Sequence, residues 1–309
     1  MTYLSMIFFQ IVAPILVLLV IGAALQRKFQ FNLKAMSHLI IYCFMPVTVL
    51  LNIYETTIEM SVLGQVALFI LLLIGSQMLL GHVIAKILGL NRMESAVFKN
   101  SVVLINSGNY GIPVAQMIFA TQPIGVAIQV ILVIFQNVTT YTYGLYNLIS
   151  ATKSGKEIIK DFLKMPILHA LLLGIILNVL NVNIPQTLRI PLDHISEGFI
   201  AVALITLGAQ LSQIEMRTML NKTILISCFT RLIVGPAVAL LIIFILGLDG
   251  VVAQSLLIAS SFPTSRNSSS LALEYDIESN TAAQTVLLST IVSCLTVTVV
   301  IYLSTVLFG

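Results

Sequence analysis

The sequence contains few charged residues. Only 9% of its 309 residues are Asp, Glu, Lys or Arg, whereas 58% are hydrophobic. Soluble globular domains carry about 25% charged residues, so a domain folded in water could not bury this much apolar surface. The low charge content therefore excludes a soluble domain and predicts a chain that folds in the lipid bilayer. The formal net charge of +3 gives no reason to expect a nucleic-acid partner.

Cysteine is also scarce. The three cysteines lie far apart in apolar stretches, and the sequence has no CxxC or Cys/His spacing. This pattern predicts small packing residues, with no disulfide, metal site or cofactor. The apolar segments also lack HExxH, GxSxG and paired aspartates, so the sequence does not predict an intramembrane enzyme. A sensor is not favoured either, because no soluble domain is present to carry its output.

Apolar segments of about 20 residues recur, each long enough to cross a hydrocarbon core about 30 Å thick. The first has no basic residue before its apolar core and no small-x-small cleavage site, so we interpret it as a membrane span. The sequence predicts an all-α membrane protein of ten transmembrane helices, at 6–26, 35–53, 62–85, 97–120, 124–148, 166–183, 194–213, 223–247, 253–274 and 281–307.

The basic residues are distributed unevenly between the loops. The loops after odd-numbered segments hold twelve Lys and Arg residues, and those after even-numbered segments hold only Arg189. The positive-inside rule places loops rich in Lys and Arg in the cytoplasm. We therefore predict a multi-pass protein of the plasma membrane with both termini outside.

The two halves of the chain resemble each other. PILVLLVIG begins at Pro14 and PILHALLLG at Pro166, while prolines within two segments, Pro113 and Pro263, are separated by a similar interval. Five segments per half would insert the halves in opposite orientations, as in many secondary transporters. The predicted boundaries are 1–150 for the first repeat, 151–165 for a cytoplasmic linker and 166–309 for the second, inverted repeat.

Turn-forming residues interrupt two of the ten segments. NSGNYGIP occupies 106–113 and SSFPTSRNSSS occupies 260–270. A broken helix persists at membrane depth only where protein or a watery cavity satisfies the freed backbone groups. Matched interruptions in the two halves therefore predict two broken helices that cross at a transport site.

The predicted crossing is positively charged. We expect each second half-helix to begin at its proline, with its positive N-terminal end directed at the crossing. Arg266 adds a full charge, which costs at least ~2.5 kcal/mol in a membrane and is better tolerated opposite an anion. An ion pair with Glu274 or with a neighbouring helix is the alternative for Arg266. The predicted binding residues are Asn106, Ser107, Asn109, Tyr110, Gly111, Pro113, Pro263, Ser265, Arg266 and Asn267.

Other polar residues within segments give weaker indications. Arg231 either bonds to backbone carbonyls or serves as a gating or coupling charge. Further candidates to line the pocket are Asn52, Gln129, Gln136, Asn137, Tyr141 and Gln210.

The interrupted segments resemble a known family. NSGNYGIPVAQ resembles the fourth-span motif of the auxin efflux carrier family, which includes plant PIN-type carriers and bacterial malonate- and malate-type permeases. The match to the plant motif is Asn106, Gly111, Ile112 and Pro113. In FPTSRNSSSLALEYD, Pro263 and Asn267 match the ninth-span pattern. ALITLGAQL (203–211) and RLIVGP (231–236) are similar to the seventh- and eighth-span patterns.

The resemblance implies a fold related to bile-acid symporters and sodium/proton antiporters. Scaffold and transport bundles would each draw helices from both halves, and the transport bundle would move like an elevator. The substrate carboxylate would lie at Asn106 and at the half-helix ends near Pro113 and Pro263. Arg266 departs from the small or apolar residue expected there, which favours a dicarboxylate over auxin.

We therefore predict a secondary transporter of small mono- or dicarboxylates such as malate or malonate. The alternative is a sodium- or proton-coupled cation antiporter or symporter on the same fold, which would need carboxylates at the crossing. The expected partners are the organic anion and the lipid bilayer, and a homodimer through one scaffold face is plausible.

Overall fold

The structure, a computed structural model, describes residues 9, 13–55, 60–148, 166–214 and 221–309. The predicted linker at 151–165 and the start of the first predicted segment lie outside these residues. Helices make up nearly all of the described chain, which contains no strand longer than one isolated β-bridge.

The described helices include four short π-helical segments, labelled η, each of which runs directly into an α-helix. The first half comprises α2 (Ala13–Phe29), α3 (Leu33–Leu39), η2 (Ile40–Phe44), α4 (Met45–Glu55), α5 (Met60–Ile87), α6 (Arg92–Val103), η3 (Ser107–Gly111), α7 (Ile112–Ile118), α8 (Pro123–Thr139), η4 (Thr140–Gly144) and α9 (Leu145–Leu148). The second half comprises α11 (Pro166–Val179), α12 (Gln186–Leu211), α13 (Lys222–Phe229), η5 (Thr230–Val234), α14 (Gly235–Leu246), α15 (Gly250–Ser260), α16 (Arg266–Glu274) and α17 (Ser279–Phe308).

Six of the described helices are long and apolar enough to cross a membrane. They cover 33–55, 62–87, 123–148, 186–211, 222–246 and 279–308. The other four predicted segments have identifiable differences. Two are interrupted, the first falls partly outside the described residues, and α11 is a shorter apolar helix. The ten-segment count and the inverted repeat stay predictions.

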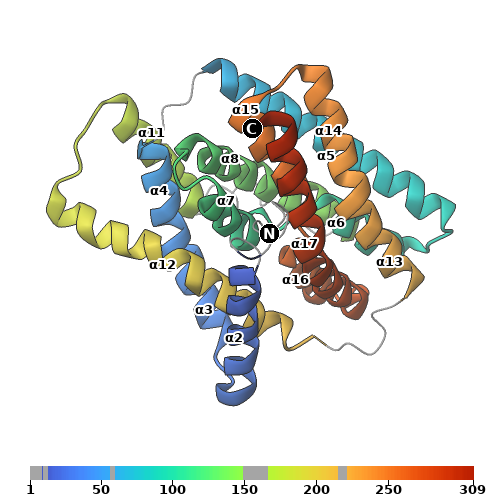
Figure 1. Ribbon diagram of the computed structural model, residues 1–309. Helices are drawn as coiled ribbons and strands as arrows, with labels where there is room; N and C mark the ends of the chain where they lie inside the picture. The colour runs from blue at the N-terminus through green and yellow to red at the C-terminus, as the bar shows by residue number, and fades with distance from the viewer. Residues whose placement is uncertain (1–8, 10–12, 56–59, 149–165, 215–220) are drawn as a thin grey trace.

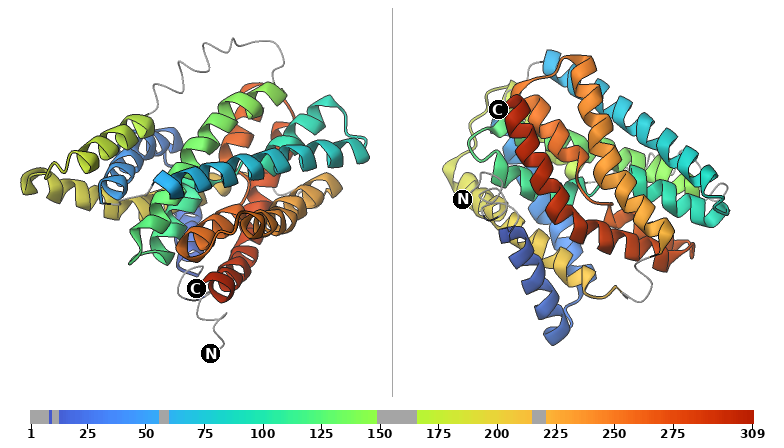
Figure 2. Two further views of the ribbon diagram at one scale, coloured as in Figure 1. Left: turned by 90° about the horizontal axis from the view of Figure 1, so that it is seen from above. Right: turned by 45° about the vertical axis from the view of Figure 1, so that its right-hand side comes forward.

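The helices pack into two groups (Figure 1). The outer group comprises α2, α3, η2, α4, α11 and α12, in which α2 packs along α12 and α11 along α4. The crossing group comprises the helices α5 to α9 and α13 to α17. The groups meet where α4 packs against α8 and where α12 packs against η3 and α7. The left view of Figure 2 shows α11 and α12 at one side of the molecule, with α4 beside them.

Two glycines allow α2 and α12 to pack closely. A Cβ added at Gly208 would lie 2.0 Å from Leu19 O, and one added at Gly22 would lie 2.0 Å from Ile205 O. Small residues at helix interfaces let backbones approach in membranes, where packing replaces the hydrophobic effect between helices. The outward faces are apolar. Leu79, Ile245 and Leu295 have exposed fractions of 65%, 71% and 65%, as expected for side chains that face lipid.

Candidate functional site: a cavity at the helix crossing

The two predicted interruptions are present and are joined to each other. α6 ends at Val103 and α15 ends at Ser260. The chain then extends on both sides and forms an antiparallel bridge between Ile105 and Thr264. Asn106 N donates to Pro263 O at 2.8 Å, and Ser265 N donates to Leu104 O at 2.7 Å. The backbone groups freed by one broken helix are thus satisfied partly by the other.

Arg231 binds the ends of both first half-helices. Its side chain is 1% exposed. Nη1 donates to Val102 O at 2.9 Å in α6, and Nη2 donates to Ser260 O in α15. Both acceptors lie in the last turn of a helix, where carbonyls lack intrahelical donors and the helix dipole is negative. Of the two roles considered for Arg231, the geometry matches binding to backbone carbonyls.

The α-helix of one second half-helix begins beside its predicted proline, and that of the other does not. In the first interruption a π-helical turn starts at Ser107, with Asn106 at its N-cap, and α7 follows from Ile112 with Pro113 in its first turn. In the second, α16 begins at Arg266, and Ser265 at the N-cap accepts a hydrogen bond from Asn267 N at 3.2 Å. A serine cap satisfies a free N–H of the first turn, which Pro263 could not do from three residues upstream. The prediction that each half-helix starts at its proline therefore agrees with α7 and is wrong for α16, which begins three residues after Pro263.

Both resumed helices direct their first turns into one cavity, which we call the crossing cavity. Its volume is about 150 Å³. One helix contributes Ser107, Gly108 and Asn109, and the other contributes Arg266 and Asn267. Free N–H groups and the positive end of the dipole make helix N-termini favourable for anions. The cavity therefore combines two such ends with a guanidinium.

Arg266 and Asn106 bring hydrogen-bond donors to the crossing cavity. Arg266 is the only charged side chain among the described residues that line it. Asn106 also lines it and is 5% exposed, and its Nδ2 has no hydrogen-bond partner. A buried donor without an acceptor costs about 1–3 kcal/mol, so an incoming carboxylate oxygen at Nδ2 is favourable. The side chain of Glu274, the alternative partner of Arg266, lies outside the described part of the structure.

The structure brings together most of the predicted binding residues. Gln136 and Asn137 of α8 complete the polar side of the cavity. The predicted residues that line it are Asn106, Ser107, Asn109, Gln136, Asn137, Ser265, Arg266 and Asn267.

Four predicted binding residues lie behind the cavity lining. Tyr110 is fully buried, with its ring edge-on to Phe262 at a centroid distance of 5.7 Å and its Oη 3.3 Å from Ser293 Oγ. A Cβ at Gly111 would lie 2.5 Å from the Phe262 ring, so glycine permits this packing. Pro113 is buried within α7, and Pro263 contributes its carbonyl to the bridge.

The weaker candidates separate in space. Gln129 binds Ser255 by donating to its carbonyl at 2.8 Å, and the Asn52 side chain donates to Thr48 O at 2.7 Å within its own helix. Gln210 faces a different cavity, described below. Tyr141 belongs to η4, and its side chain lies outside the described part of the structure.

Sequence reasoning missed the apolar wall of the crossing cavity. Ile41 and Met45 come from the outer group, as do Pro166 and Ile167 at the start of α11. Val133 of α8 adds to this wall. These residues carry no local signal, because only the packing of α4 and α11 against the crossing group brings them there. The site thus lies between the two groups of helices.

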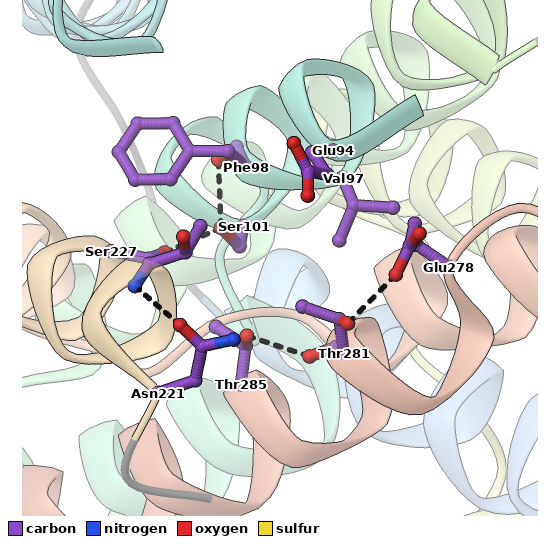
Figure 3. Close-up of a pocket in the computed structure, with 10 residues that line it drawn as sticks. Glu94, Val97, Phe98, Ser101, Asn221, Ser227, Glu278, Thr281 and Thr285 are labelled. Atoms are coloured by element: carbon purple, nitrogen blue, oxygen red, sulfur yellow. Dashed lines mark hydrogen bonds between the residues drawn. The ribbon is translucent and has the colours of Figure 1, made fainter. Parts of the chain in front are cut away.

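A separate polar cavity of about 80 Å³ lies near the start of α6 (Figure 3). Two carboxylates line it, but both have local partners. Glu94 accepts from Asn91 N at 3.0 Å as part of a capping box, and Glu278 accepts from Thr281 Oγ1 at 3.0 Å. No residue lines both this cavity and the crossing cavity in the described chain. Nor do the described residues include a group of three or more His, Cys, Asp and Glu suited to a metal ion.

Comparison with known proteins agrees with a membrane location. The family described as membrane transport protein matches residues 7–301. An uncharacterized transporter of Methanocaldococcus jannaschii is 26% identical over 273 residues, covering 85% of this chain and 87% of the relative. An uncharacterized transporter of Methanothermobacter thermautotrophicus is 28% identical over 198 residues, covering 62% of this chain and 63% of the relative. Neither printed name states a substrate.

Proposed function

Since the chain belongs to the membrane transport protein family, we propose that it is a secondary transporter of small organic anions. The substrates would be mono- or dicarboxylates such as malate or malonate, carried across the plasma membrane. One observation carries the proposal. Arg266 and the unpartnered Nδ2 of Asn106 face the same cavity, at the joined N-terminal ends of two interrupted helices. A carboxylate has two oxygens that can accept from both groups at once.

The distribution of charge separates this proposal from the cation-transport alternative. A site for Na⁺ or H⁺ at membrane depth would need carboxylates. Among the described residues that line the crossing cavity, none is Asp or Glu. Glu94 and Glu278 line a different cavity and already cap backbone or side-chain groups. Cation coupling remains the alternative, to be tested by comparing carboxylate uptake into proteoliposomes with and without sodium and pH gradients.

The position of the site also supports an elevator movement. The polar residues of the crossing cavity come from the crossing group, and most of its apolar wall comes from the outer group. If the crossing group slid along the outer group, the polar residues would stay together while the apolar wall changed. Such a displacement would expose one site alternately to the two sides of the membrane.

The first test is binding of carboxylates to purified protein. Malonate, malate or a related acid at a hundred times its dissociation constant should stabilise the folded state by about 2.7 kcal/mol, seen as a raised melting temperature. Arg266→Gln and Asn106→Leu should each remove most of this shift while the proteins remain folded. Arg189→Gln is the matched control, because Arg189 pairs with Glu55 and Asp193 away from the cavity.

Two results would refute the proposal. One is a wild-type protein that neither binds nor transports any small carboxylate. The other is an Arg266→Gln variant that transports all tested carboxylates at the wild-type rate, since the guanidinium would then have no part in binding.

A further inference from the structure

Arg266 faces a second cavity as well as the crossing cavity. This second cavity, which we call the wide chamber, has a volume of about 400 Å³, compared with about 150 Å³ for the crossing cavity. It lies between the C-terminal end of α12, the first turns of α16 and the start of α17. Among the described residues, Arg266 is the only one that lines both cavities.

The wide chamber is lined by neutral polar groups in addition to this guanidinium. Gln210 is 7% exposed, and its Nε2 donates to Ser37 Oγ at 2.9 Å. Ser37 in turn donates to Leu33 O at 2.8 Å, so its hydroxyl hydrogen is committed and the amide of Gln210 must present Nε2 to it. Gln210 Oε1 is then left without a partner, so this amide presents an acceptor to the chamber, and the donors for an anion come from Arg266 and from α17. Asn280 and Gln284 of α17 add further amides.

The predicted orientation places the wide chamber on the cytoplasmic side. Leu33 and Ile214, which line it, adjoin two of the loops rich in Lys and Arg. No Asp or Glu occurs among its described lining residues. An anion that enters from the cytoplasm would therefore meet one guanidinium and the amides of α17 in the lining.

We propose that the wide chamber is a second anion-binding site, which takes polycarboxylates too bulky for the crossing cavity and inhibits transport. The inference rests on the proposed function, because both sites use Arg266. When a polycarboxylate in the wide chamber holds the guanidinium, fewer of its donors are available to the substrate in the crossing cavity. Binding at the two sites is then competitive, although the sites do not overlap.

The test uses benzene-1,3,5-tricarboxylate, a rigid trianion, as an inhibitor of labelled malonate uptake into proteoliposomes. With the trianion on both faces of the vesicles, we expect competitive inhibition and no transport of the trianion itself. A separate assay measures binding of the labelled trianion through its displacement. This binding should be lost in Arg266→Gln. Uptake that the trianion leaves unchanged at all concentrations would overturn the inference.

Asn280 offers a matched pair of variants. It is exposed at the edge of the wide chamber and does not line the crossing cavity, so substitutions there should fold normally. Asn280→Asp should raise the inhibition constant of the trianion about threefold and Asn280→Lys should lower it about threefold, the size expected of one exposed charge. Equal inhibition constants in the two variants would contradict a binding site in the wide chamber.

A variant that fills the wide chamber gives an independent measurement. Ala283 lines only the wide chamber and is half-buried. Ala283→Leu should raise the inhibition constant of the trianion about tenfold, because the added side chain occupies its space. The melting temperature of Ala283→Leu shows whether this variant folds. If it does not fold, the two Asn280 variants still test the inference. If malonate binds through Arg266 but neither the Asn280 pair nor Ala283→Leu alters inhibition, only this inference fails. If malonate binding does not depend on Arg266, both the proposed function and this inference are wrong.

Discussion

The two arginines buried among the helices have different surroundings and therefore different roles. Arg231 is enclosed by protein and donates to carbonyls of α6 and α15. Arg266 is less buried and lines two cavities. A guanidinium has five donors, so it can bind the negative ends of two helices at once. Arg231 thus fixes the C-terminal ends of the two first half-helices, and Arg266 lies at the N-terminal end of a second half-helix.

The role of Arg231 leads to a stability prediction. Arg231→Met leaves Val102 O and Ser260 O buried without donors, which costs about 1–3 kcal/mol for each. We expect a lower melting temperature and a malonate dissociation constant raised about tenfold, because the crossing loses its alignment. Arg231→Lys should fall between Arg231→Met and wild type, since one ammonium retains the charge. Arg27→Met, at an exposed position near the end of α2, is the control. A variant with wild-type melting temperature and wild-type affinity would show that the hydrogen bonds to the two helix ends contribute nothing.

At the residue scale, the polar part of the crossing cavity was predictable. Burying polar residues at membrane depth costs free energy, so they are rare in apolar segments. Asn106, Ser107 and Arg266 are therefore conspicuous in the sequence. Tyr110 was also predicted, but its ring packs on Phe262, a contact that depends on the distant second half of the chain. Ser265 is a residue type preferred at helix N-caps, so the start of α16 could have been predicted from the sequence. The prediction used Pro263 instead.

At the scale of the helices, the tightest contact is between α2 and α12. Gly208→Ala would place its Cβ 2.0 Å from the backbone of Leu19, so the two helices must separate. Overpacking of this kind costs about 1–3 kcal/mol, and the melting temperature of the purified protein should fall accordingly. Gly75→Ala is the control, because nothing lies within 4 Å of its added Cβ in α5. There, alanine should stabilise the helix by about 0.5–1 kcal/mol. Equal effects at the two glycines would mean that α2 and α12 are not in close contact.

The positions of several helices follow from the sequence, whereas their irregularities do not. The predicted segments at 223–247 and 281–307 agree closely with the apolar helices at 222–246 and 279–308. The π-helical segment η5, which contains Arg231, was not predicted. A π-helical segment shifts later side chains around the helix by a fraction of a turn, and hydrophobic periodicity over so few residues is too imprecise to reveal it.

At the scale of the whole molecule, the arrangement in the membrane can be tested by labelling. Positive-inside loops predict that residue 222 faces the cytoplasm and residue 181 the outside. Both positions are exposed in the structure. In a variant with the three native cysteines replaced, Asn181→Cys should react with a membrane-impermeant maleimide on intact cells. Lys222→Cys should react only after permeabilisation. The reverse pattern would show that the chain has the opposite orientation, with its termini inside.

The bridge between Ile105 and Thr264 limits how this molecule can change shape. Separating the two interrupted helices would break the backbone hydrogen bonds of Asn106 N and Ser265 N. It would also break the hydrogen bond from Thr264 Oγ1 to Ser101 O and the two hydrogen bonds that Arg231 donates to α6 and α15. The two interrupted helices are therefore held together as one unit, whereas Met45 and Ile167 contribute an apolar face to the cavity from the outer group. We therefore expect an amphiphilic acid whose apolar tail packs against that face to prevent the interrupted helices from moving relative to the outer group.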